Sequence, residues 1–519
     1  MVNRTFVRTM LILGLSYPML ACTGSTGTIG DSGTAGSIDG SENDPDYQFN
    51  NGGAGGTYVD EDVNQYSNNG TGGSNNGYAD NGGSNNQGTG GSGDGTVTLS
   101  PNENGTDPLA EISASVALPI LYVHDRAGSS QQFESQAIRF VANGYPGGRI
   151  IDFQHDGSDN VDTSSIIGTM EELIDNVLSG QSVEQIYLIG HGRGTELATN
   201  YLTNPANANK IAKYVSLDGV GCANLNIPCI GLAAADNDDW GQTQTMEGQT
   251  HVEVATSPES FVAMFNFLVG YDPKVVNIVT QRAAIQIAGL VVDYPSNAPV
   301  TGGILDIWEV DSSTGQRTGS APVGSFMLSD EGAFGPVAVE PTKHYEHFLY
   351  FEDGSSGHHF YSQPYLRSTG FIRLQTGETT EEQAQYANPG DDHSILTLIR
   401  QREWTTDDII EMSMSSDQLG TAKIDNVIST DIGIDNVALT IQDDTSTPGE
   451  STMELLSWFD SDPQQAGIDV FVAGATEPDG VISITNYPRG DTSRPQTVNV
   501  PNWASSTHAI SVLFSDYAR

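Results

Sequence analysis

Basic residues are scarce in this sequence of 519 residues. It has 20 Lys and Arg, only five of them lysines, against 66 Asp and Glu, which gives a formal net charge of −46. Such a chain repels phosphate backbones and anionic lipid surfaces, so nucleic acid is not an expected partner. Acidic, Lys-poor surfaces suit high salt, where screening relieves self-repulsion, although a soluble secreted surface explains the composition equally well.

Long apolar runs are also missing. After the N-terminus no run approaches the ~18 residues that span a membrane. Residues 1–22 have Arg4 and Arg8, an apolar stretch from Met10 to Leu20, and then Cys22, which together predict a signal peptide. The ending M-L-A-C resembles the lipobox of bacterial lipoproteins, with Leu20 where a smaller residue is usual. We expect a bacterial cell-envelope protein lipidated at Cys22; ordinary secretion, leaving Cys22 as a free thiol, is the alternative.

Only three cysteines are present. Apart from Cys22, they are Cys222 and Cys229, which lie close together in a chain predicted to be exported. Export permits a disulfide, and two is an even number, so we expect these two residues to pair across a short loop.

Residues 23–112 contain mostly Gly, Asn, Ser and Asp. Such a segment cannot bury enough apolar surface to offset the entropy lost on ordering, so we expect a disordered linker. As a flexible coil of about 90 residues it would span on the order of 50 Å. We interpret it as a tether that holds the folded part away from the membrane.

Strand and helix patterns alternate over residues 113–271. Strands are expected near residues 118–123, 149–153, 186–189, 214–217 and 228–233, with an amphipathic helix around 166–178 and a helix at 258–268 capped by Ser257. This alternation predicts a parallel sheet covered by helices on both faces, and so an α/β domain. From residue 272 to 519 short alternating runs separated by turns predict an all-β domain of sandwich or barrel type.

The stretch V-E-Q-I-Y-L-I-G-H-G-R-G-T, residues 183–195, has the pattern of a nucleophile elbow. In the motif G-x-S-x-G, two glycines let a strand and a helix approach while the central serine stands above the sheet. Here the central residue is Gly192, so the turn is present and the attacking atom is missing.

The segments at 132–136 and 140–146, together with L-D-G at 217–219, T-H-V at 250–252 and S-P-E at 257–259, resemble lipases of the α/β-hydrolase superfamily. The nearest resemblance is to the archaeal lipase that has a C-terminal β-barrel. It implies that Gly192 stands at the nucleophile position, Asp218 at the acid and His251 at the base. It also implies oxyanion donors in the backbone N–H groups of Arg126 and Arg193. Asp236 is the competing acid.

One departure from the family pattern is Asp125, which replaces the glycine usual after His124. A carboxylate beside an oxyanion hole is unhelpful unless it points outward. The long lid of the family is also absent, because residues 152–165 are few and polar, so an acyl groove should be open.

The resemblance implies a lipase or carboxylesterase that acts on or binds acyl esters or fatty acids, and the missing serine implies impaired hydrolysis. Activation of a water by a His–Asp dyad, in the space left by the serine, is a second route to activity. On this basis Gly192→Ser is expected to create esterase activity. The alternative is a silent lipid-binding or adhesive surface lipoprotein.

Four histidines fall in one stretch of the β region: His344, His347, His358 and His359. Adjacent residues of a strand point to opposite faces, and no cysteine joins the group, so we expect neither a metal site nor a cofactor. By family resemblance, residues 273–519 are expected to bind long-chain acyl ligands.

Overall fold

The computed structural model describes residues 117–159, 161–235, 244–281, 284–354, 356–377, 388–416, 420–429, 432–433, 436–459 and 464–515. The predictions made for Cys22, for the linker 23–112 and for Asp236 lie outside these residues. Among the described helices, none has the length and apolar character needed to cross a bilayer.

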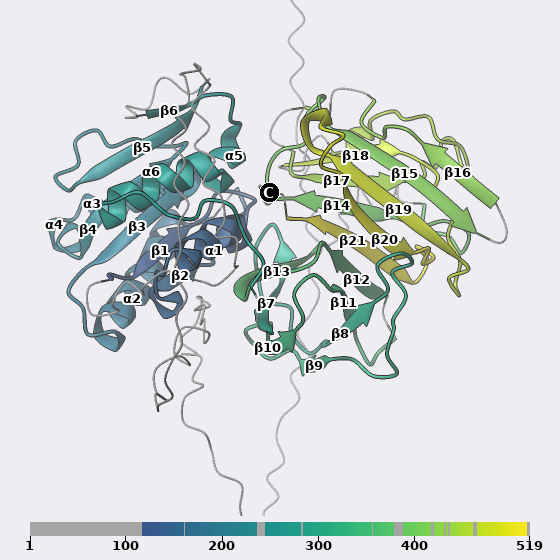
Figure 1. The fold of residues 1–519 in the computed structure, drawn as a ribbon, viewed down its shortest axis with the longest axis horizontal. Coiled ribbons are helices and arrows are strands. Elements are labelled where there is room, and N and C mark those ends of the chain that lie inside the picture. The colour runs from purple at the N-terminus through teal and green to yellow at the C-terminus, as the bar shows by residue number, and fades with distance from the viewer. Residues whose placement is uncertain are drawn as a thin grey trace, which may run out of the picture. The chain divides into compact units, whose positions relative to one another are not determined.

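Six parallel strands form the sheet of the first domain (Figure 1), in the order β2-β1-β3-β4-β5-β6. Their short apolar runs are buried on both sides, as parallel strands usually are. The strands are β1 (Ile120–Val123), β2 (Ile150–Phe153), β3 (Ile186–His191), β4 (Ile211–Leu217), β5 (Cys229–Ala234) and β6 (Gln244–Met246).

Helices cover both faces of this sheet. On one face lie α1 (Glu134–Ala142), α5 (His251–Thr256) and α6 (Pro258–Val269), which pack Phe140, Val254 and Phe261 against the strands. On the other face lie α2 (Thr163–Gly180) and α3 (Arg193–Leu202), followed by the short α4 (Pro205–Ala208). The predicted α/β domain is therefore confirmed.

Local signals placed two of these elements correctly. The predicted amphipathic helix is α2, and Ser257 caps α6 by accepting a hydrogen bond from Ser260 N at 3.1 Å. A 3₁₀ turn (Ser130–Phe133) directly precedes α1. Cys222 and Cys229 form a disulfide in the loop between β4 and β5, with a Cα–Cα distance of 5.7 Å.

The rest of the described chain is built from strands arranged in three sheets, as predicted for an all-β region. The three-stranded sheet has the order β10-β7-β13, the eight-stranded sheet β18-β17-β14-β21-β12-β11-β8-β9, and the four-stranded sheet β16-β15-β19-β20. The strands are β7 (Ile285–Tyr294), β8 (Ile304–Val310), β9 (Gly324–Met327), β10 (Ala333–Val339), β11 (His344–Tyr350), β12 (Gly357–Ser362), β13 (Thr369–Gly377), β14 (Leu396–Arg400), β15 (Ile409–Ser416), β16 (Gly420–Ile424), β17 (Ala438–Gln442), β18 (Gln465–Asp469), β19 (Gly480–Tyr487), β20 (Gln496–Pro501) and β21 (His508–Phe514).

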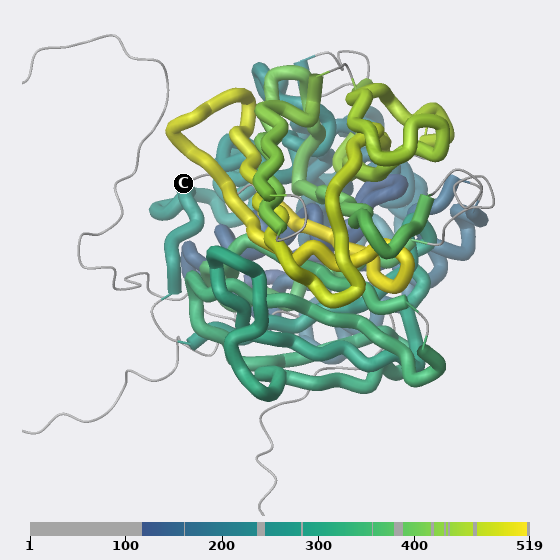
Figure 2. Tube along the Cα trace, turned by 90° about the vertical axis from the view of Figure 1, so that its right-hand side faces the viewer, coloured from purple at the N-terminus to yellow at the C-terminus, as the bar shows by residue number. Residues whose placement is uncertain are grey.

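The eight-stranded sheet is shared between two cores. One half packs against the three-stranded sheet through residues such as Ile287, Leu305 and Ile372. The other half packs against the four-stranded sheet through residues such as Leu439 and Ile484. Figure 2 traces the first set of strands in teal and green and the second in green to yellow. The β region is thus sandwich-like, with two sheets packed on one long sheet.

A fully buried ion pair joins this β region to the first domain. Arg373 on β13 contacts Asp152 on β2, and both side chains are 0% exposed. Arg373 Nε also donates to Gln154 Oε1 at 3.1 Å, and its backbone N–H donates to Gln131 Oε1 at 3.1 Å. The polar groups of β13 are therefore satisfied by residues of the hydrolase domain.

Arg373→Met is expected to lower the free energy of unfolding by about 3–5 kcal/mol, because it leaves the Asp152 carboxylate buried without its cation. Lys343→Met is the matched control: its pair with Glu309 is 49% and 32% exposed and is weakened by solvent, so we expect little change in the free energy of unfolding. Urea unfolding monitored by circular dichroism measures both. Equal losses in the two variants would contradict this account of the buried pair.

Candidate active site

A sharp turn joins β3 to α3 at Gly192. This residue has φ 49° and ψ −118°, a conformation that glycine adopts without the steric cost of a side chain. Two residues later, a Cβ on Gly194 would lie 2.2 Å from Val123 O, so only glycine lets α3 approach β1 this closely. The turn therefore has the geometry expected of a nucleophile elbow, with hydrogen at its apex.

Two of the predicted site residues meet beside this turn. Asp218 follows β4 and His251 is the first residue of α5. His251 Nδ1 donates to Asp218 Oδ2 at 2.6 Å, while Asp218 Oδ1 accepts from Ala234 N at 2.8 Å. Asp218 is thus placed to orient the imidazole, as the acid of a hydrolase triad does.

The third partner of the imidazole is Asp125. Its Oδ2 accepts a hydrogen bond from His251 Nε2 at 2.8 Å, and its Oδ1 accepts one from the backbone N–H of Arg193 at 2.5 Å. A Cβ built on Gly192 would lie 2.1 Å from Asp125 Oδ1. The carboxylate therefore points into the site rather than outward, and it fills the space that a serine side chain would need.

This position corrects two expectations drawn from the sequence. Gly192→Ser alone would drive the new side chain into Asp125, so it cannot simply restore a serine site. No space is left at the elbow for the water that the dyad was expected to activate, because Asp125 occupies it. Of the two predicted oxyanion donors, the backbone N–H of Arg193 binds Asp125. The Arg126 side chain is exposed and pairs with Asp159 at 3.4 Å, and the role of the Arg126 backbone N–H stays a prediction.

The loop that carries Asp125 is fixed on both sides. His124 stacks on His155 with ring centroids 3.7 Å apart, and its Nε2 accepts from His155 N at 3.1 Å. Gln132 accepts from Asp125 N at 3.4 Å and donates to His191 Nδ1 at 2.7 Å. Since Asp125 is only 7% exposed, its carboxylate is held in place by buried neighbours.

The contacts of Asp125 and His251 shift both pKa values. Burial opposes the charged form of His251, but the hydrogen bonds and negative charges of Asp125 and Asp218 outweigh it and raise its pKa well above the ordinary value. Burial would likewise raise the pKa of Asp125, but the contacts with His251 outweigh burial and lower it. Both shifts favour a charged pair, a partly exposed His251 imidazolium between two buried carboxylates.

Asp125, His191 and His251 lie close enough to be considered as metal ligands, with ligand atoms within 4.8 Å of one another. Hydrogen bonds already account for these atoms. His191 Nδ1 accepts from Gln132, and its Nε2 donates to His251 O at 3.0 Å. Burial lowers the pKa of His191 to about 4, so this ring is neutral. These three side chains therefore lie together because Asp125 and His251 are hydrogen-bonded to each other and His191 packs against His251.

Two of the four histidines singled out in the β region, His358 and His359, form hydrogen bonds with other side chains. His358 contacts Ser511 Oγ at 2.8 Å, whereas His359 contacts Glu346 Oε1 at 2.5 Å and His508 Nδ1 at 2.9 Å. His358 and His359 are neighbours on β12 and face opposite sides of the sheet. Their arrangement is that of packed sheet residues.

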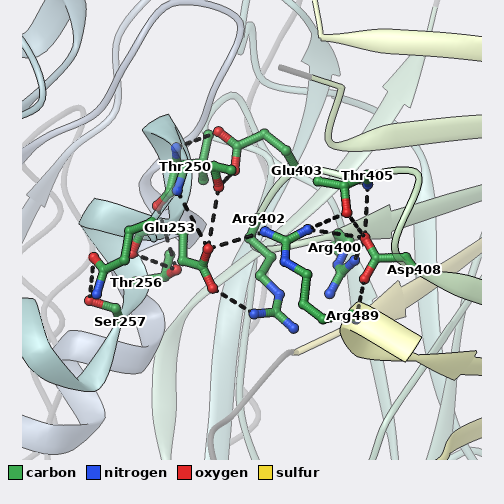
Figure 3. Close-up of polar contacts among 12 residues, drawn as sticks. Thr250, Glu253, Thr256, Ser257, Arg400, Arg402, Glu403, Thr405, Asp408 and Arg489 are labelled. Atoms are coloured by element: carbon green, nitrogen blue, oxygen red, sulfur yellow. Dashed lines mark hydrogen bonds and ion pairs between the residues drawn. The ribbon is translucent and has the colours of Figure 1, made fainter. Parts of the chain in front are cut away.

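The N-terminus of α5, and with it His251, is held by a residue of the β region (Figure 3). Glu403 is 2% exposed and accepts hydrogen bonds from Val252 N at 2.6 Å and from Thr250 Oγ1 at 2.5 Å. Thr250 and Glu253 also form a capping box, which the sequence T-H-V-E encodes. Glu403 lies about 150 residues away, so no local pattern pointed to it.

An ion-pair network extends this contact. Glu253 Oε1 binds Arg402 at 2.7 Å and Glu253 Oε2 binds Arg489 at 3.1 Å, and Figure 3 shows both arginines reaching α5 from the β region. Arg489 and the buried Arg400 both contact Asp408, at 3.3 and 2.8 Å. The helix that carries the base is therefore anchored by charged residues from the segments between β strands.

Comparison with protein families gives two matches, both in the β region. Residues 283–379 match the model of the lipase C-terminal domain, and residues 382–518 match a second model that describes a C-terminal domain. The protein is a lipase/esterase-like α/β-hydrolase. The boundary between the two matched segments falls between β13 and β14. Each segment therefore holds one half of the strands of the eight-stranded sheet of this lipase-like protein.

Solved structures of hydrolases and esterases are similar to 29–30% of this chain. They include a CIB-like hydrolase from Thermoplasma acidophilum (14% identity, TM-score 0.23, 30% of this chain and 87% of that chain covered). They also include a carboxylesterase from Nitrososphaera gargenis (10%, 0.23, 30% and 90%) and an esterase from a marine microorganism (12%, 0.23, 29% and 95%). A search of curated protein sequences gave no match.

The triad predicts a specific dependence of stability on pH. The raised pKa of His251 stabilises the fold below its unfolded value of about 6.5, and this contribution is lost as pH rises through the folded pKa. The lowered pKa of Asp125 stabilises the fold above about 3.9 and is lost as pH falls. The melting temperature of wild type minus that of Asp125→Asn should therefore be largest between about pH 4 and 6.5 and shrink toward pH 9. A difference that stays constant over pH 5–9 would contradict the ion triad.

Removal of the buried Glu403 carboxylate should weaken the anchoring of α5. Glu403→Ala leaves Val252 N–H and the Thr250 hydroxyl without this acceptor, and we expect unfolding to become easier by about 1–3 kcal/mol. In Glu403→Gln the amide oxygen can still accept from Val252 N–H, so the loss should be smaller. Chemical denaturation compares the variants, and an unchanged Glu403→Ala protein would show that the contact does not support α5.

Proposed function

We propose that this protein is a catalytically silent lipase/esterase-like hydrolase of the bacterial cell envelope that binds acyl esters or fatty acids without hydrolysing them. The observation that carries the proposal is the position of Asp125 between Arg193 N and His251 Nε2. Ester hydrolysis requires a nucleophile, a base and an oxyanion donor. Gly192 removes the first, and Asp125 occupies the other two.

The nucleophile is absent, since Gly192 has no side chain. The base is occupied, because both ring nitrogens of His251 are hydrogen-bonded to carboxylates, and these contacts raise its pKa well above the ordinary value. The oxyanion donor Arg193 N already binds an anion, and a second negative charge developing beside Asp125 would be repelled. Thr195 does not replace the serine, because its Oγ1 donates to Gly192 O at 2.6 Å.

Asp125 is also a poor substitute for serine. Attack of a carboxylate on an ester would form a tetrahedral intermediate, from which the carboxylate leaves more readily than the alkoxide of the substrate. The intermediate would therefore return to the ester and the free carboxylate, and no hydrolysis results.

Acyl ligands are the class expected from the lipase C-terminal domain match. The described β region has a cavity of about 70 Å³ lined by residues such as Met414, Ala422, Phe471 and Ile482. This cavity is smaller than the pockets of about 300–1,000 Å³ that usually bind ligands, so the acyl proposal does not rest on it. Acyl binding is therefore supported by the family match, and the envelope location by the lipobox-like sequence at Cys22.

Hydrolysis of p-nitrophenyl butyrate tests the silent site. We expect no turnover by wild type or by Gly192→Ser, and turnover by the double variant Asp125→Gly/Gly192→Ser, because only the latter has both a nucleophile and a free oxyanion donor. Since loss of the nucleophile costs about 10⁶ in kcat, the double variant should exceed wild type by at least ~10²-fold. His251→Ala should abolish this gain. Wild-type turnover that disappears with His251→Ala would overturn the proposal.

Calorimetric titration of the full chain with palmitate tests whether the protein binds acyl ligands. We expect saturable binding without turnover. No binding heat and no shift in melting temperature would remove the acyl assignment and favour an adhesive role on the cell surface.

A further inference from the structure

The carboxylate of Asp125 is held in the way that a bound ligand is held. Its two oxygens go to two different donors, Arg193 N–H at 2.5 Å and His251 Nε2 at 2.8 Å. These donors belong to α3 and α5, not to the loop of Asp125 itself. Arg193 is the first residue of the ten-residue α3, where N–H groups lack partners within the helix and favour anions.

The donors are positioned by residues other than Asp125. His251 is oriented from behind by Asp218, which accepts a hydrogen bond from Ala234 N at 2.8 Å. Its helix is anchored by Glu403 through Val252 N at 2.6 Å. The elbow fixes the direction of Arg193 N–H, because Gly192 N donates to Leu217 O at 3.0 Å. The positions of the two donors are therefore supported by residues other than their occupant.

Gly192 supplies the room for this occupant. An added Cβ would meet all three carboxylate atoms of Asp125, at 2.1, 2.2 and 2.6 Å. The space above the elbow therefore has the size of one carboxylate and is filled by one.

We propose that the elbow is a carboxylate-binding site and that Asp125 is its built-in occupant. The external ligand of matching chemistry is the carboxylate of a fatty acid, whose identity as an acyl ligand rests on the proposed function. Because Asp125 is tethered, its effective concentration at the site is high, and an external carboxylate competes poorly in the wild-type protein. Removal of the Asp125 side chain opens the site.

Acetate is the probe, since it is a carboxylate with almost no acyl chain. The full chain carrying Asp125→Gly should bind acetate saturably at pH 6, where a free imidazole is largely protonated. We expect its affinity to exceed that of wild type by at least ~10-fold. Asp125→Asn is the matched control: its amide keeps the volume of the carboxylate, so it should bind acetate no better than wild type.

Calorimetry and the imidazole ¹H and ¹⁵N shifts of His251 give two independent readouts. Acetamide at equal concentration, and chloride at equal ionic strength, should not reproduce the effect of acetate. Adding His251→Ala to Asp125→Gly should remove acetate binding. A folded Asp125→Gly protein that binds acetate no better than wild type would overturn the proposal. If that variant fails to fold, Asp125→Ala provides the same comparison.

These outcomes separate this inference from the proposed function. Acetate binding by Asp125→Gly, with no palmitate binding by wild type, would support the carboxylate site and remove the acyl function. Palmitate binding by wild type, with no acetate binding by Asp125→Gly, would mean that acyl ligands bind elsewhere and would overturn the carboxylate site.

Discussion

The hydrogen-bonded chain Asp125–His251–Asp218 decides what the hydrolase domain can do. One imidazolium lies between two buried carboxylates, at 2.8 and 2.6 Å, so each charge offsets the cost of burying the others. In a serine hydrolase the same imidazole is neutral and faces a hydroxyl. Here both ring nitrogens are bonded to acids, and under the proposed function the imidazole does not serve as the base of hydrolysis.

Two positions explain this change together. A serine site has a side chain at the elbow and a glycine in the loop after the first strand. In this protein glycine stands at the elbow and the side chain comes from the loop, so Asp125 reaches from the opposite direction into the same space. The two changes have to be considered together. Because Gly192 has no side chain, the Asp125 carboxylate fits above the elbow, where it accepts a hydrogen bond from the Arg193 N–H group.

Local patterns in the sequence were sufficient to predict the α/β domain, the elbow and part of the candidate site. Apolar runs and helical spacing predicted the parallel sheet and α2, and the G-H-G-R-G segment predicted the elbow. Chain order and family resemblance selected Asp218 and His251, which the structure brings into contact. The direction of Asp125 was not predictable, because it depends on the His124–His155 stack and on Gln132, which meet only in the folded chain. Glu403 was missed for a similar reason, since its partners on α5 are about 150 residues away. The eight-stranded sheet was also missed, because alternating apolar residues indicate a strand but not the strand with which it pairs.

The protonation state of His251 tests the ion triad most directly. In ¹⁵N-labelled wild-type protein at pH 8, where a free imidazole is neutral, NMR should show protons on both Nδ1 and Nε2 of His251, shifted downfield by their carboxylate partners. In Asp125→Asn the Nε2 proton signal should move upfield or vanish. A wild-type His251 with only one protonated nitrogen at pH 8 would contradict the triad and reopen general-base catalysis at this site.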